Sequence, residues 1–155
     1  MGTEGLRVGI DPQSVPGTVT AGSSFDVVLL ISNRGALPVQ ASSSSPAIIT
    51  FRATGGAFRL EKVDLPTSGS KYEHAPGTPV IKVVSPLEGR ELTGAVGYFD
   101  GLRLTIKAKE FTGNDDPVDA GLLAAACYQY STKMSANVCI DTSVYSFKKQ
   151  RKACD

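Results

Sequence analysis

One segment of the sequence alternates apolar and polar residues without interruption. In residues 102–109, leucine, leucine, isoleucine and alanine occupy every second position, and arginine, threonine and two lysines occupy the positions between them. Successive side chains of a β-strand point to opposite faces of a sheet, so this spacing predicts a strand with one face in a core and the other in water. A helix would repeat its apolar residues at a different period.

Shorter segments of the same kind recur along the chain, between clusters of glycine, proline and asparagine. Residues 25–31 are apolar at nearly every position, which is typical of a central strand covered on both faces. The other predicted strands are 6–10, 47–52, 57–60, 79–85, 92–99 and 134–141, and we expect the first four along the chain to be antiparallel neighbours. The predicted core contains Val27, Leu29, Ile31, Leu104, Ile106 and Val138.

The connections follow from turn residues. Pro66 to Thr78 is predicted to be an exposed loop, and Asp100-Gly101 a hairpin turn. The segment 116–130 allows two interpretations, because Asp116 and Pro117 before several alanines are typical of a helix start. A glycine and two tyrosines further on favour a strand over 122–132, which we prefer.

With that strand, the chain holds eight or nine short strands and no crossover helix. This arrangement predicts an all-β fold, an antiparallel immunoglobulin-like β-sandwich, formed by residues 1–155 as a single domain. We also expect this domain to be one module of a longer protein.

The charge balance excludes several classes of protein. The chain has 16 lysines and arginines against 15 aspartates and glutamates, a net charge of +1. Nucleic-acid and membrane-surface proteins need a basic patch, and the only basic run, at 148–152, is typical of a solvated strand edge. No apolar stretch approaches the roughly 20 residues of a membrane span. We therefore expect no nucleic-acid partner and no membrane insertion of this domain.

The motifs of common enzyme classes are missing from the sequence. It has a single histidine, His74, and no nucleophile elbow, zinc-protease motif or phosphate-binding glycine loop. The acidic segment from Asn114 to Asp119 offers oxygen ligands for Ca²⁺, but it lacks EF-hand spacing, and a solvated turn is the simpler interpretation. We predict that the protein is not an enzyme and has no catalytic residue, no cofactor and no resident metal.

Three cysteines lie close together near the end of the chain: Cys127, Cys139 and Cys154. Clustered cysteines are typical of a local disulfide in an extracytoplasmic protein, and all three are candidates. A hairpin centred on Lys133 would place Cys127 opposite Cys139, and a turn near Ser146 would place Cys139 opposite Cys154. We favour the second pair, while both remain open. Three other interpretations of the cysteines are possible. A zinc site would need a fourth ligand, and a nucleophilic cysteine would need His74 as its base. Reduced, buried thiols would fit a cytosolic protein.

Short phrases at both ends of the chain resemble a known family. Cys-Tyr-Gln-Tyr-Ser-Thr at 127–132, Val-Cys-Ile-Asp at 138–141 and Lys-Ala-Cys at 152–154 resemble the end of immunoglobulin-like modules of archaeal secreted or membrane-anchored surface proteins, of the CARDB-like kind. Val-Val-Leu-Leu-Ile-Ser-Asn-Arg-Gly at 27–35 is similar to the start of their second strand. The resemblance implies an extracytoplasmic, non-enzymatic module for adhesion or assembly.

The sequence therefore predicts a structural or protein-interaction module of a cell-envelope or secreted protein, located outside the cell or on its surface. Its partners would be other proteins or further copies of itself. Two other functions stay open. One is a subunit of a self-assembling particle or filament. The other is a carbohydrate-binding module that uses the nearby tyrosines Tyr128, Tyr130 and Tyr145, although such tyrosines also cap sheet faces.

Overall fold

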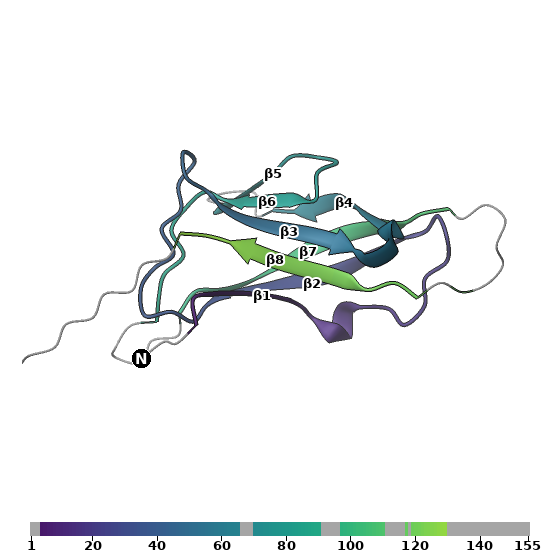
Figure 1. The fold of residues 1–155 in the computed structure, drawn as a ribbon, viewed down its shortest axis with the longest axis horizontal. Coiled ribbons are helices and arrows are strands. Elements are labelled where there is room, and N and C mark those ends of the chain that lie inside the picture. Colours follow the sequence, from purple (N-terminus) through teal and green to yellow (C-terminus); the bar gives the residue numbers. More distant parts are fainter. Residues whose placement is uncertain (1–3, 66–69, 91–96, 111–116, 118, 130–155) are drawn as a thin grey trace, which may run out of the picture.

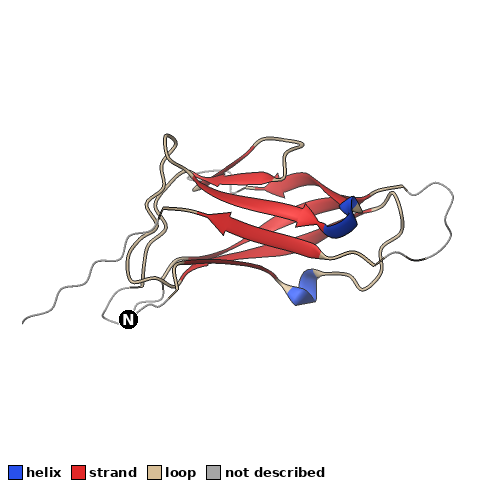
Figure 2. Ribbon diagram, in the orientation of Figure 1, coloured by secondary structure: helices blue, strands red, loops and turns tan. Residues whose placement is uncertain are grey.

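The computed structural model describes residues 4–65, 70–90, 97–110, 117 and 119–129. Its strands are β1 (Leu6–Ile10), β2 (Ser24–Asn33), β3 (Ala47–Ala53), β4 (Phe58–Asp64), β5 (Tyr72–His74), β6 (Val80–Val83), β7 (Phe99–Ala108) and β8 (Leu122–Cys127). Two short 3₁₀ turns, η1 (Pro12–Ser14) and η2 (Thr54–Gly56), follow β1 and β3. The strands form two antiparallel sheets, ordered β1-β2-β7-β4 and β5-β6-β3-β8 (Figure 1). The sheets pack together as a β-sandwich, which confirms the predicted fold class (Figure 2).

The facing sides of the two sheets form the core. The alternation of β2 and β7 places their apolar residues inward, and Val27 pairs with Leu104 across these two central strands. All of the predicted core residues that the structure describes are fully buried, while Val138 lies outside the described residues. The second sheet adds Ile49, Phe51, Ile81 and Val83 to the same core.

The alanine-rich segment after Gly121 is a strand, as we preferred, and not a helix. β8 pairs with β3 over six residues, and Leu122, Ala124 and Ala126 pack against the core. The ladder with β3 outweighs the helix propensity of alanine, because small side chains also fit between packed sheets. β8 ends at Cys127, so the predicted strand over 122–132 is too long by at least Tyr128 and Gln129. Its predicted continuation beyond residue 129 and the predicted strand at 134–141 lie outside the described residues.

The predicted hairpin turn at Asp100-Gly101 is wrong. Both residues lie within β7, opposite Ile31 and Leu30 of β2. The aspartate carboxylate accepts hydrogen bonds from the Gly101 amide at 2.8 Å and from the Tyr98 hydroxyl at 2.9 Å. A long ladder with a distant strand therefore outweighs a local turn signal. Residues 92–96 of the predicted strand 92–99 lie outside the described residues, and of residues 97–99 Phe99 alone is in a strand.

Two further predictions need correction. The segment predicted as a loop from Pro66 to Thr78 contains the short strand β5, because its backbone pairs with β6. The first four strands are not all neighbours, since β3 belongs to the second sheet and β4 pairs with β7. Among the strands that the structure describes, β1 with β2 and β5 with β6 are the only pairs that are both consecutive and paired, so the other connections between these strands cross between the sheets.

Candidate functional site

The candidate site lies at the end of the sandwich where β2 ends and β7 begins. Asn33, the last residue of β2, is 2% exposed and is the one buried polar residue in the part of the chain that the structure describes. Its Nδ2 donates to the carbonyl oxygens of Leu37 and Leu87, each at 3.0 Å, and its Oδ1 accepts from the Gly35 amide at 2.9 Å. One buried amide thus holds two loops together.

Backbone hydrogen bonds complete this framework. Val39 and Leu87 exchange both of their backbone hydrogen bonds, at 2.9 and 3.2 Å, and the Arg90 amide donates to the Gly35 carbonyl at 2.7 Å. Gly97 lies so close to Asn33 that a Cβ would overlap the Asn33 carbonyl oxygen. The backbones of the described parts of these loops are therefore closely packed.

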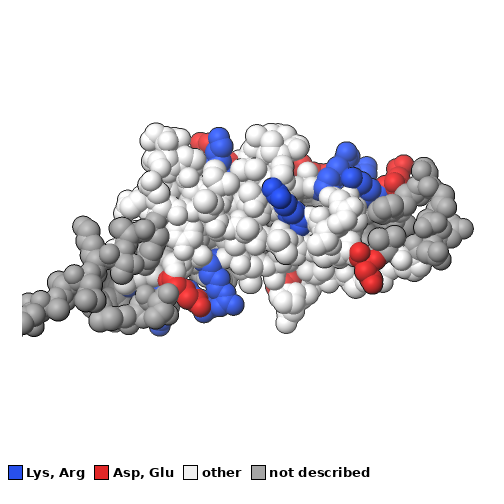
Figure 3. Space-filling model, viewed as in Figure 1, with Lys and Arg blue, Asp and Glu red and all other residues white. Residues whose placement is uncertain are grey.

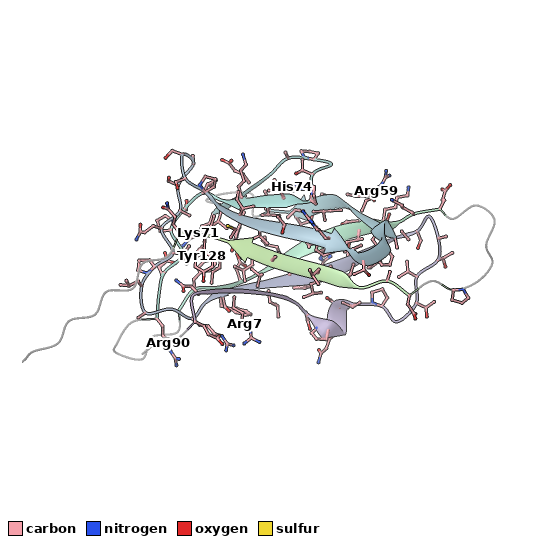
Figure 4. All side chains as sticks on the ribbon, viewed as in Figure 1. Arg7, Arg59, Lys71, His74, Arg90 and Tyr128 are labelled. Carbon is pink, nitrogen blue, oxygen red and sulfur yellow. The ribbon has the colours of Figure 1, made fainter. Side chains whose placement is uncertain are left out.

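Three arginines and a phenylalanine are carried by this framework. Arg7 of β1 pairs with Ser32, and Ser32 pairs with Phe99, so these side chains share the outer face of the first sheet. Arg34, Arg90 and Phe99 line an open cavity of about 300 Å³ with Ser32, Asn33, Gly97 and Tyr98. Figure 4 shows Arg7 and Arg90 at the same end of the molecule. We call Arg7, Arg34, Arg90 and Phe99 the arginine–phenylalanine surface.

The arginines of this surface are exposed, and among the described residues none of them forms an ion pair. The neighbouring carboxylate of Glu88 is already held by Lys71, whose Nζ lies 2.8 Å from both of its oxygens. That bond lowers the pKa of Glu88. Glu4 also precedes β1 at this end, and it makes no ion pair with the arginines. Figure 3, which is viewed from the side of the second sheet, shows a few basic side chains at this end with acidic ones beside them. Within the described residues, the three guanidinium groups therefore have no acidic partner.

The phenyl ring of Phe99 is 65% exposed. The next residue on the same face of β7 is Gly101, which pairs with Leu30, and Leu30 pairs with Gly9 of β1. Because the two glycines have no side chains, the surface of the sheet around Leu30 and the phenyl ring is flat. A large exposed aromatic next to unpaired arginines is typical of a recognition surface.

A partly buried chain of hydroxyl groups lies behind this surface. The Tyr72 hydroxyl donates to the Tyr98 hydroxyl at 3.0 Å, which donates to the carboxylate of Asp100. Lys71 Nζ lies 4.6 Å from the centre of the Tyr98 ring. Burial is the main cause that raises the pKa of Tyr98 to about 12, and it raises the pKa of Tyr72 further. Both phenols therefore stay neutral near pH 7, and they hold the segment before Phe99 in place.

The structure describes one of the three predicted tyrosines. Tyr128 is half-buried, and its hydroxyl accepts a hydrogen bond from the Leu6 amide at 3.0 Å. The hydroxyl lies so close to Gly5 that any side chain at that position would overlap it. Tyr128 therefore joins the end of β8 to the start of β1, as a residue that caps a sheet does. Tyr130 and Tyr145 lie outside the described residues.

The predicted cysteine and metal sites are described only in part. Cys127 is an exposed, free cysteine at the end of β8, whereas Cys139, Cys154, residues 114–116 and the basic run 148–152 lie outside the described residues. His74 lies on β5, at the far edge of the sheet from β8, and its Nε2 is 3.0 Å from the Thr78 carbonyl oxygen. The fold thus keeps Cys127 and His74 apart. Among the described residues, no three histidine, cysteine or acidic side chains form a group that could hold a metal ion.

The arginine–phenylalanine surface was not predicted from the sequence. In the sequence, Asn33, Arg34 and Gly35 follow the predicted strand 25–31 and belong to the phrase at 27–35, and Phe99 is the last residue before a predicted turn. One signal could have located Phe99, because the water-facing positions Arg103, Thr105 and Lys107 extend backwards to residue 99 at the same period of two.

Comparison with known proteins adds no assignment. No family model matches the chain, and no curated protein is similar to it in sequence. Within the described residues, no helix has the length and apolar character needed to cross a membrane.

Proposed function

We propose that the protein is a non-enzymatic, immunoglobulin-like interaction module of a secreted or cell-envelope protein. The observation that carries this proposal is the arginine–phenylalanine surface. Arginine and aromatic residues are enriched in protein–protein interfaces, and a few such residues supply most of the binding energy. Here Phe99 is exposed beside three arginines without ion pairs to other described residues.

The framework behind the surface supports the same function. Arg34 and Arg90 stand on loops held by the Asn33 side chain and by the bond from the Arg90 amide to Gly35. A surface whose backbone is already ordered loses less conformational entropy when a partner binds. The clustered cysteines and the resemblance to CARDB-like modules support a location outside the cytoplasm.

Photo-crosslinking tests this proposal in the cells that produce the protein. Phe99 is replaced in the full chain by the photoreactive analogue p-benzoylphenylalanine, and the control carries the analogue at Leu123, which is 60% exposed on the other sheet. We expect light-dependent adducts with protein from position 99 alone, and removal of the module by protease added to intact cells. An adduct between two copies of the chain would favour the assembly alternative. Equal adducts at both positions, or none at either, would refute the proposal.

A further inference from the structure

We infer that the arginine–phenylalanine surface binds a short acidic segment of a partner protein, in which carboxylates flank an apolar side chain. This inference rests on the proposed function and names the chemistry of its partner. It follows from the charge of the surface, from its apolar centre and from the charges on the rest of the same sheet face.

The charged groups select a carboxylate ligand. Arg7, Arg34 and Arg90 carry three guanidinium groups on or beside the outer face that presents Phe99. A guanidinium group donates two parallel hydrogen bonds to one carboxylate, which makes such pairs both strong and directional. The nearby acidic groups Glu88 and Asp100 already have partners within the molecule. Glu4, the other described acid at this end, forms no ion pair. Among the described residues, three guanidinium groups therefore stand against one free carboxylate, and a net positive charge is left for an external acid.

The centre of the surface selects an apolar group. Phe99 and Leu30 lie on a flat area of the sheet between the glycines at 9 and 101. An aliphatic or aromatic side chain placed there would remove the phenyl ring from water, at roughly 25 cal/mol per Å² of apolar surface. A neutral sugar would need several hydrogen-bond acceptors as well. Asn33 and Tyr98 in this cavity are already bonded within the protein, which leaves the Ser32 hydroxyl as the remaining neutral polar side chain of the lining.

The charges on the rest of the outer face of the first sheet indicate that the acidic segment is short. Further along the same side of the sheet, Asp26 accepts a hydrogen bond from Thr105 at 2.8 Å and lies 3.8 Å from Arg103. Lys62 and Asp64 of β4 form another ion pair. This part carries charges of both signs that satisfy one another, so a long polyanion lying along the face would meet carboxylates. A polypeptide, whose charge changes along its chain, fits this pattern better than a nucleic acid or an acidic polysaccharide does.

Fluorescence anisotropy tests the inference with the full chain and one labelled peptide, Glu-Asp-Glu-Leu-Phe-Glu-Asp-Glu. We expect binding that weakens as salt rises, because the contacts are ionic. Replacing both Arg34→Glu and Arg90→Glu should weaken binding about 10-fold or more, and Phe99→Ser about 5-fold. The matched control carries Arg52→Glu and Lys109→Glu, two exposed positions at the other end of the sandwich, and should bind within about 2-fold of the wild type.

The outcomes separate the inference from the proposed function. Equal losses in the two double variants would show attraction to net charge alone and would overturn the inference. Tighter binding of a single-stranded oligonucleotide or of polygalacturonate than of the peptide would overturn the choice of partner. If the charge-reversed variant does not fold by circular dichroism, Arg34→Gln with Arg90→Gln takes its place. Crosslinking to protein at position 99 without peptide binding would overturn only the ligand chemistry, whereas absence of crosslinking would overturn the function.

Discussion

Replacing Asn33 by alanine should destabilise the protein by about 2–4 kcal/mol. The substitution removes the oxygen that accepts the hydrogen bond of the buried Gly35 amide, and an unsatisfied buried donor costs about 1–3 kcal/mol. The Leu87 carbonyl keeps its bond from the Val39 amide. The Leu37 carbonyl oxygen, which packs closely against Gly89, loses the bond from Nδ2. Loss of the side-chain volume adds a smaller amount.

Urea unfolding followed by circular dichroism measures this change. Ser32→Ala is the matched control, because Ser32 precedes Asn33 on the outer face of β2 and should change the free energy of unfolding by less than about 0.5 kcal/mol. Asn33→Asp keeps the size of the side chain but replaces the donating Nδ2 with an oxygen. When the carboxyl is ionised, this oxygen faces two carbonyl oxygens and cannot donate to them. Its buried carboxyl should have a raised pKa, so this variant should be more stable below pH 4 than at pH 7. A loss below about 0.5 kcal/mol for Asn33→Ala would refute the role assigned to the amide.

Three further outcomes are expected. Ile106→Ala should lower the free energy of unfolding by about 2–5 kcal/mol in the same assay, because this side chain is 0% exposed, and a change under about 0.5 kcal/mol would contradict its burial. Since the pKa of Tyr98 is raised from 10.0 to about 12, the folded state holds this proton more tightly, and stability should fall between those two pH values. In a pH series of thermal unfolding, the Tyr98→Phe variant should lose less stability than the wild type between these pH values. An equal loss in both proteins would contradict the role assigned to the Tyr98 proton. Alkylation of the non-reduced protein followed by mass spectrometry should modify Cys127 alone if Cys139 and Cys154 are bridged, and three modified thiols would refute any bridge.

Periodicity predicted the parts of the fold that depend on single strands. The alternation in β7 located its buried residues, and the apolar run of β2 located a strand with neighbours on both sides. Periodicity could not predict which strands are neighbours, because strand pairing depends on contacts between segments that are distant in the sequence. Asp100-Gly101 illustrates the limit, since the same two residues close hairpins elsewhere but here continue a ladder.

The candidate site was beyond sequence reasoning for the same reason. Arg7, Arg34 and Arg90 come from three separate segments, and none belongs to a basic run. They come together because β1 pairs with β2 and because the Arg90 amide reaches Gly35. The predicted tyrosine site drew attention to Tyr128, whose hydroxyl instead binds the backbone of β1.

The connections that cross between the sheets determine how this chain reaches its fold. Asp26 and Thr105 hydrogen-bond across the two central strands although they are 79 positions apart. A chain dominated by such distant pairings must close large loops before the contacts stabilise it, and all-β sandwiches accordingly fold over milliseconds to seconds. During synthesis, β2 leaves the ribosome well before β7 exists to cover its edge, so its apolar run stays unpaired on that side for several seconds.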